Sequence, residues 1–114
     1  MRPEKLYLTD ILEAAEAIAL FCVRVSYADF VGDDMRRSAV LQKLIVIGEA
    51  AAHLPDVFCL AHAEVPWLDV IGFRNIAVHE YFAIQWNIVW VAAMEDVPAL
   101  YQQVERIVKE EFSD

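Results

Sequence analysis

Apolar residues recur at steps of three and four along four separate segments of this chain, which is the spacing of one face of an α-helix. No stretch alternates apolar and polar residues with the period of two that a half-buried strand requires. Only 3 of the 114 residues are glycine and 4 are proline, so little interrupts these segments. The sequence therefore predicts one all-α domain over residues 1–114, an antiparallel four-helix bundle.

The two predicted helices in the first half of the chain are bounded by recognisable start and stop residues. The first covers about 7–25 and is followed by a stretch, 26–32, in which the apolar spacing breaks down. The second covers about 34–54. Asp33 is a plausible N-cap for it, and Pro55 ends it because the residue before a proline leaves the helical region.

The second half begins with a segment, 56–65, that is predicted to be irregular. The third helix opens at Pro66, a residue that suits the first turn, and stops near 78–81. The fourth covers about 85–112 and contains Pro98 in its interior. Proline lacks the backbone N–H of a regular helix, so this helix should kink or split there.

The apolar content, 59% of the residues, is more than one domain of this length can bury. A second buried surface is expected, most simply the interface of a homodimer. The most apolar stretch, 17–25, is too short to cross a membrane and is interrupted by Arg24. Since the N-terminal residues also lack a small-residue cleavage site, we expect a cytoplasmic protein without a membrane partner.

The formal net charge is −9, from 18 acidic and 9 basic residues. An acidic chain is repelled by nucleic acid at long range, which excludes an extended non-specific track and favours a basic partner or a small basic cleft. Cys22 and Cys59 lie in apolar surroundings and are predicted to be reduced core residues. Cys59 and His62 have a metal-binding spacing, but no second Cys/His pair accompanies them, so no metal site is predicted.

A group of polar residues, Arg74, Asn75 and His79, interrupts the apolar run of the third helix. Asn75 and His79 are four residues apart and face the same way on a helix. Arg74 and His79 are five residues apart, about 140° around the axis. Their side chains converge only if the helix ends near His79, or if a second subunit brings its own copy alongside.

The residues Arg74-Asn75-x3-His79-x-Tyr81 resemble the Arg-x4-His-x-Tyr motif of the HEPN superfamily, specifically the HepT-like toxins. The likeness extends over about residues 7–107 through three further stretches and a shorter one: Tyr7-Leu8-x2-Ile11-Leu12-Glu13-Ala14, Ile47-Gly48-Glu49-Ala50-Ala51, Pro66-Trp67-x3-Ile71-Gly72-Phe73-Arg74-Asn75 and Val89-Trp90.

This resemblance implies a helical homodimer whose two motifs meet in one cleft. It implies a metal-independent ribonuclease that needs no cofactor, with Arg74 and His79 as catalytic residues. It also implies a toxin paired with an MNT-type nucleotidyltransferase antitoxin, which transfers AMP from ATP to Tyr81.

The residue types suit RNA cleavage. RNA carries its own nucleophile, the 2′-hydroxyl, and the enzyme must supply a base, an acid and positive charge on the phosphorane. Histidine can act as the base and as the acid near neutral pH, and the planar guanidinium of arginine donates paired hydrogen bonds to phosphate oxygens. Two subunits provide two copies of His79, so base and acid could come from opposite chains. Asn75 could hold a phosphate or orient His79, and a nucleotide on Tyr81 would block RNA by bulk and charge.

Several residues have two interpretations. Glu49 either supports Arg74 from the second helix or faces solvent. Arg36 and Arg37 either guide RNA or form a solvated face, which the acidic net charge favours. The tryptophans are interpreted as core or interface anchors. A function of another class also fits: a catalytically silent helical dimer that binds a nucleotidyltransferase partner or a nucleotide.

Overall fold

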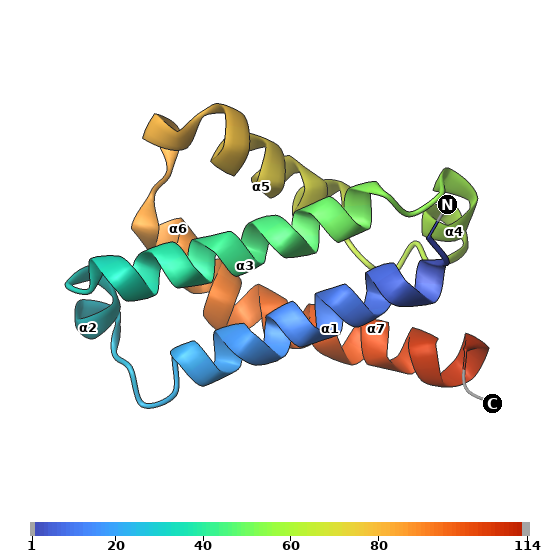
Figure 1. Cartoon of the computed structure of the whole chain (residues 1–114), viewed down its shortest axis with the longest axis horizontal. Coiled ribbons are helices and arrows are strands. Elements are labelled where there is room, and N and C mark those ends of the chain that lie inside the picture. Colours follow the sequence, from blue (N-terminus) through green and yellow to red (C-terminus); the bar gives the residue numbers. More distant parts are fainter. Residues whose placement is uncertain (1, 113–114) are drawn as a thin grey trace.

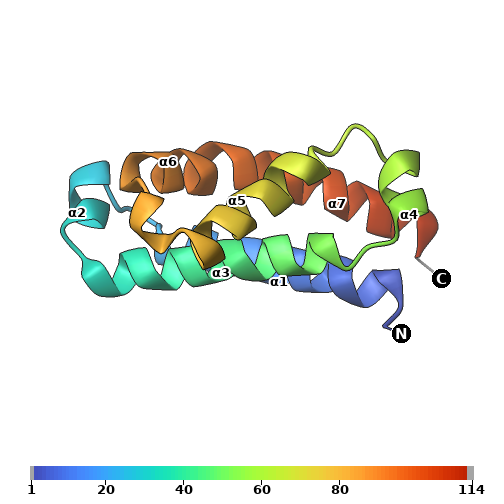
Figure 2. The ribbon, with the colours of Figure 1, turned by 90° about the horizontal axis from the view of Figure 1, so that it is seen from above.

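The computed structural model describes residues 2–112, which form helices and no strand (Figure 1). Three long helices and one composite helix run alternately in opposite directions along the molecule (Figures 1 and 2). They are α1 (Glu4–Phe21), α3 (Asp34–Ala52), α5 (Trp67–His79) and the consecutive segments α6 (Trp86–Val91), η2 (Ala92–Asp96) and α7 (Val97–Glu111). The predicted antiparallel four-helix bundle is confirmed.

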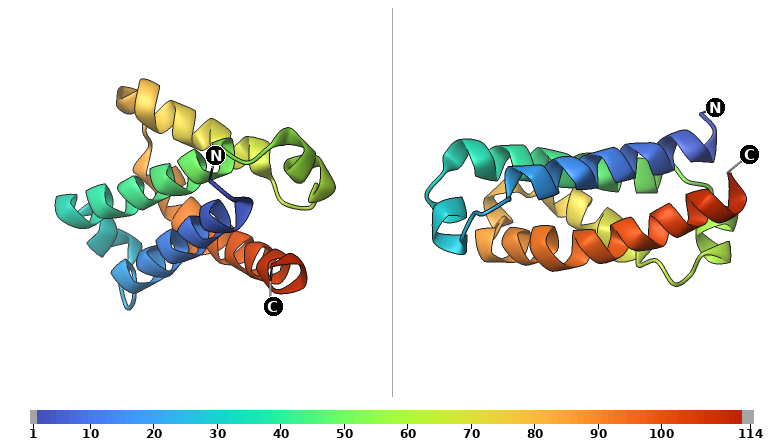
Figure 3. Two further views of the ribbon diagram at one scale, coloured as in Figure 1. Left: turned by 45° about the vertical axis from the view of Figure 1, so that its right-hand side comes forward. Right: turned by 90° about the horizontal axis from the view of Figure 1, so that it is seen from below.

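Helix α1 packs against both α3 and α7, whereas α5 packs mainly against α3. Figure 3 shows α1 beside α7 and both chain ends at the same end of the bundle. The most completely buried large side chains within residues 2–112 come from α1, α2, α3, α6 and α7 and none comes from α5: Leu8, Ile11, Ile18, Phe30, Val40, Val89 and Val104. None of the helices within residues 2–112 combines the length and apolar character that crossing a bilayer demands.

Both segments that the sequence predicted to be non-helical contain a short helix. Helix α2 (Tyr27–Val31) forms because Ser26 and Asp29 cap it reciprocally: the Asp29 N–H donates to Ser26 Oγ (3.1 Å) and the Ser26 N–H to the Asp29 carboxylate (3.2 Å). Helix α4 (Asp56–Ala61) follows Pro55. Elements of five or six residues are too short to show a helical apolar period, so the spacing did not reveal them.

The first helix lies a few residues earlier than predicted and begins at Glu4 rather than near Tyr7. It ends at Phe21 rather than near Val25, because the chain turns at Arg24, which has a positive φ of 58°. Helix α3 begins as predicted, with the Asp33 carboxylate accepting a hydrogen bond from the Arg36 N–H (3.1 Å). The predicted boundaries of α5 also agree closely with the structure.

The tryptophans act as anchors within the chain. Trp67 is buried, and its indole N–H donates to the carbonyl of His62 (3.0 Å). Trp86 and Trp90 are half-buried and pack around Phe30, with ring centroids 6.4 and 5.2 Å away. These contacts fix the short helix α2 against the start of the composite fourth helix.

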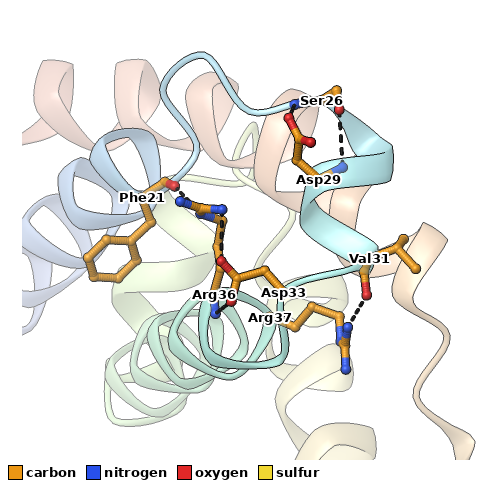
Figure 4. A network of polar contacts seen from close by, with 7 residues as sticks. All are labelled: Phe21, Ser26, Asp29, Val31, Asp33, Arg36 and Arg37. Carbon is orange, nitrogen blue, oxygen red and sulfur yellow. Dashed lines mark hydrogen bonds and ion pairs between the residues drawn. The ribbon is translucent and has the colours of Figure 1, made fainter.

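Arg36 and Arg37 do not form the solvated face favoured by the sequence (Figure 4). Arg36 donates to the Phe21 carbonyl (2.9 Å) and to Asp33 (2.9 Å). Arg37 donates to the Val31 carbonyl and pairs with Asp34 (3.2 Å). Both guanidinium groups therefore hold the turns around α2 to the start of α3.

The fourth helix is split as Pro98 predicts. Proline cannot donate to the carbonyl four residues earlier, so the regular ladder is interrupted there. The structure accommodates this with the π-helical segment η2, after which α7 starts with Pro98 in its first turn.

The crossing of α3 and α5 depends on Gly48. A Cβ atom at Gly48 would lie 2.2 Å from the Cβ of Arg74 and 3.2 Å from the carbonyl oxygen of Val70. Such distances are inside van der Waals contact, so only glycine lets the two backbones approach this closely. Figure 2 shows α5 crossing over α3. The crossing fixes where Arg74 lies.

We predict that Gly48→Ala and Gly72→Ala have opposite effects on stability. The first should lower the free energy of unfolding by about 1–3 kcal/mol, because the new methyl group overpacks the crossing. The second should raise it by roughly 0.5–1 kcal/mol, because alanine favours the helix and no atom lies within 4 Å of the new Cβ. Urea denaturation measures both, and a neutral Gly48→Ala would contradict the close crossing.

Candidate functional site

The motif residues lie at the C-terminal end of α5. Arg74, Asn75 and His79 are on the helix, which ends at His79, and Tyr81 follows in the 3₁₀ turn η1 (Tyr81–Ala83). This end of α5 diverges from α3 and projects from the bundle (Figures 1 and 3). The helix thus ends at His79, which is one of the two conditions that the sequence set for Arg74 and His79 to converge, but within residues 2–112 the two side chains make no hydrogen bond to each other.

Arg74 is held by Glu49 of α3. Its Nη1 donates to Glu49 Oε1 at 2.7 Å, and the Arg74 side chain is only 19% exposed. Glu49 follows Gly48 directly, so the close crossing that Gly48 permits also brings the carboxylate to the guanidinium. Of the two interpretations of Glu49, support of Arg74 is the one observed.

The Arg74 guanidinium is not fully satisfied. Its Nε is buried and has no hydrogen-bond partner within residues 2–112. The guanidinium uses one N–H donor in its bond to Glu49, and the same planar group carries further N–H donors. Glu49 therefore orients Arg74 without using all of its hydrogen-bonding potential.

Asn75, His79 and Tyr81 are exposed, and none of their side chains has a hydrogen-bond partner among residues 2–112. Asn75 and His79 share a helix face by their spacing. The structure thus brings Arg74 and Glu49 together within one chain. It leaves the amide, the imidazole and the phenol open to another molecule at the same helix end.

Exposed apolar side chains surround the motif, and the sequence patterns did not single them out. Phe82 is 101% exposed and contacts the edge of the Tyr81 ring, with centroids 6.3 Å apart. Ile76 and Val78 are also close to half exposed. Their position between the motif residues could have indicated this exposure, because one short helix cannot bury apolar side chains on all of its faces.

The cysteines and histidines outside the motif have structural surroundings. Cys22 is buried, as predicted for a core residue, Cys59 is half-buried, and burial raises the pKa of both thiols. His62 lies between two carboxylates, 2.6 Å from Glu111 and 3.8 Å from Glu64. In the part of the chain that the structure describes, no group of three or more Asp, Glu, His or Cys side chains is placed to hold a metal ion.

We predict a measurable coupling between Glu49 and Arg74. A double-mutant cycle with Glu49→Gln and Arg74→Met should give about 1 kcal/mol, since the Arg74 side chain is largely buried while that of Glu49 is 46% exposed and partly screened. The more exposed pair Lys109–Glu105 is the matched control and should give at most about 0.5 kcal/mol. Urea denaturation at low and high salt measures both, and equal values for the two pairs would contradict a special role for Glu49.

Comparison with known proteins gives a family match over most of the chain. The family model described as "Ribonuclease HepT-like" matches residues 11–107. "Putative RNase MJ1380" of Methanocaldococcus jannaschii is 38% identical over 91% of this chain and 95% of its own. "Probable ribonuclease HepT" of Thermococcus cleftensis is 35% identical over 95% of this chain and 98% of its own.

A third relative, "Putative RNase TTE0752" of Caldanaerobacter subterraneus subsp. tengcongensis, is 34% identical over 97% of this chain and 99% of its own. No solved structure matches the chain. The matched region contains all of the motif residues and Glu49. With its helical bundle and its motif at the free end of α5, the chain belongs to the ribonuclease HepT-like family, as the sequence motifs indicated.

Proposed function

We propose that this protein is an endoribonuclease that cleaves RNA without a metal ion and serves as the toxin of a HEPN/MNT-type toxin–antitoxin pair. The observation that carries the proposal is the end of α5, where a partly buried ion pair with Glu49 orients Arg74 and where His79 is exposed. The family match and the ribonuclease names of the relatives support the reaction class.

The proposed reaction needs only groups of this chain and the substrate. One histidine takes the proton of the 2′-hydroxyl, and the freed oxygen attacks the adjacent phosphorus. The bond from phosphorus to the 5′-oxygen breaks, and this oxygen receives a proton from an acid. The products are a 2′,3′-cyclic phosphate and a 5′-hydroxyl. Arg74 stabilises the charge on the phosphorane, and Asn75 binds a phosphate oxygen or orients His79.

A homodimer supplies both proton-transfer groups. One chain has a single histidine in the motif, whereas two α5 ends placed together would provide a base and an acid from opposite subunits. The exposed Ile76, Val78 and Phe82 support such a contact, because covering them with a second copy removes apolar area from water. Each large apolar side chain that becomes fully buried contributes about 1.5–3 kcal/mol.

Tyr81 is the proposed control point. Its side chain is 55% exposed, so its hydroxyl is accessible to a second protein. An MNT-type nucleotidyltransferase antitoxin would transfer AMP from ATP: the phenol oxygen bonds to the α-phosphorus, and pyrophosphate leaves with the phenol proton passing to a base. The attached phosphate is negative and lies seven residues from Arg74, where it would occupy and repel the RNA site.

A catalytically silent helical dimer that binds a nucleotidyltransferase or a nucleotide is the second candidate. One observation favours it: Arg74 already has a carboxylate partner, and a phosphate would have to compete with Glu49 or use the remaining donors. The net charge of −9 also suits a protein partner. The two candidates differ in whether His79 is needed for RNA cleavage.

We predict that the purified protein cleaves total RNA in the presence of a chelator and that His79→Ala reduces the rate by roughly 10²–10⁴-fold, the usual contribution of acid–base catalysis. His53→Ala is the matched control, because His53 is an exposed histidine that stacks on Tyr7 outside the motif. Its activity should equal that of the wild type, and the products should carry cyclic-phosphate ends. Equal cleavage by His79→Ala would remove His79 from the mechanism.

We also predict that treatment with ATP and the MNT-type nucleotidyltransferase abolishes RNA cleavage by the wild type but not by Tyr81→Phe. Intact-mass measurement should detect one AMP on the wild type and none on Tyr81→Phe. Tyr27→Phe, which removes the hydroxyl of another partly exposed tyrosine, should behave as the wild type. AMP on Tyr81→Phe would assign the modification to another residue.

A further inference from the structure

A groove of about 500 Å³ lies between α5 and the composite fourth helix. It exists because α5 packs mainly on α3 and leaves the fourth side of the bundle open. Its apolar lining comes from three sides of the bundle and includes Leu44, Ile47, Val70, Phe73, Ile88 and Leu100. The groove contains none of the motif residues, so the proposed function does not use it.

The groove is elongated along the fourth helix. Its lining residues on this side run from Ile88 to Gln103, a span of 15 residues. At 1.5 Å per residue this corresponds to roughly 22 Å of helix, or about four turns. On α5 the lining includes Asp69, Val70 and Phe73, which lie within two turns. This shape suits a helical segment better than a compact small molecule.

All ionisable side chains that line the groove are carboxylates: Glu64, Asp69 and Asp96. Glu64 lies 3.8 Å from His62, and neither Asp69 nor Asp96 has an ion-pair or hydrogen-bond partner within residues 2–112. The pattern of an apolar floor with an acidic rim attracts cations and repels phosphate. RNA is therefore an unsuitable occupant.

We infer that this groove is a docking site for a basic amphipathic helix of another protein. Apolar residues at helical spacing would fill the floor, and flanking Lys or Arg side chains would pair with the three carboxylates. A second copy of this chain is less suitable in this groove, because five of its nine bases already pair with acidic side chains within residues 2–112. The occupant would touch Val70 and Phe73, so it would contact the helix that carries Arg74 from the groove side.

The test uses two synthetic peptides of about 14 residues, which is roughly 21 Å of helix. One is an amphipathic Leu/Lys helix, and the other has the same composition in a scrambled order. In a fluorescence anisotropy titration of the full chain, the amphipathic peptide should bind at least about tenfold more tightly than the scrambled one, and added salt should weaken its binding.

Variants then locate the contact. The double variant Asp69→Asn/Asp96→Asn should bind about tenfold more weakly, a loss of about 1.4 kcal/mol. The matched control Glu13→Gln/Glu110→Gln removes two exposed carboxylates outside the groove and should bind as the wild type. Ile88→Lys places a positive charge in the groove at a residue that is 48% exposed, and it should abolish binding with an unchanged circular dichroism spectrum.

Equal binding of both peptides, or an equal loss in both double variants, would overturn the inference, because the attraction would then be non-specific. Dissociation of a dimer by Ile88→Lys in sedimentation would also overturn it and assign the groove to a second copy of the chain. These variants lie outside the motif, and their RNA cleavage should persist. A failure of docking is thus distinguishable from a failure of the ribonuclease proposal.

Discussion

The close crossing of α3 over α5 is the constraint on which the candidate site depends. Gly48 has no side chain, and the Cβ of Arg74 occupies the space that a side chain would need. The same approach brings Glu49 within 2.7 Å of the Arg74 guanidinium, so backbone packing and ion pairing reinforce each other. An arginine oriented in this way loses less conformational entropy when it binds a phosphate than a freely mobile one.

Most of the positive charge of this protein is committed to its own structure. Within residues 2–112, five of its nine bases take part in ion pairs with acidic side chains: Arg2, Arg36, Arg37, Arg74 and Lys109. Two of them, Arg36 and Arg37, hold the turns around α2. An extended basic surface for RNA is therefore not available on this acidic body, and under the proposed function RNA would be bound locally, at the end of α5.

The surplus of apolar residues is distributed unevenly. Many are buried between α1, α3 and α7, but α5 is covered mainly on the side that faces α3. Its projecting end exposes Ile76 and Val78, and the turn η1 that follows exposes Phe82. The other flank of α5 lines the groove with Val70 and Phe73. One helix thus carries the motif and two uncovered surfaces. This is the physical basis for proposing two different contacts, one with a second copy and one with a basic partner.

The sequence by itself determined which long segments are helical and where the motif lies, but not the short helices α2 and α4. Apolar spacing, the Asp33 cap, Pro55 and Pro98 act over a few residues, so local rules place the long helices and the split in the fourth. Only the tertiary structure decided that Glu49 pairs with Arg74, that Arg36 and Arg37 are structural, and that a groove opens beside α5. These features depend on which helices cross and how closely, and such contacts join residues far apart in the chain that no local pattern relates.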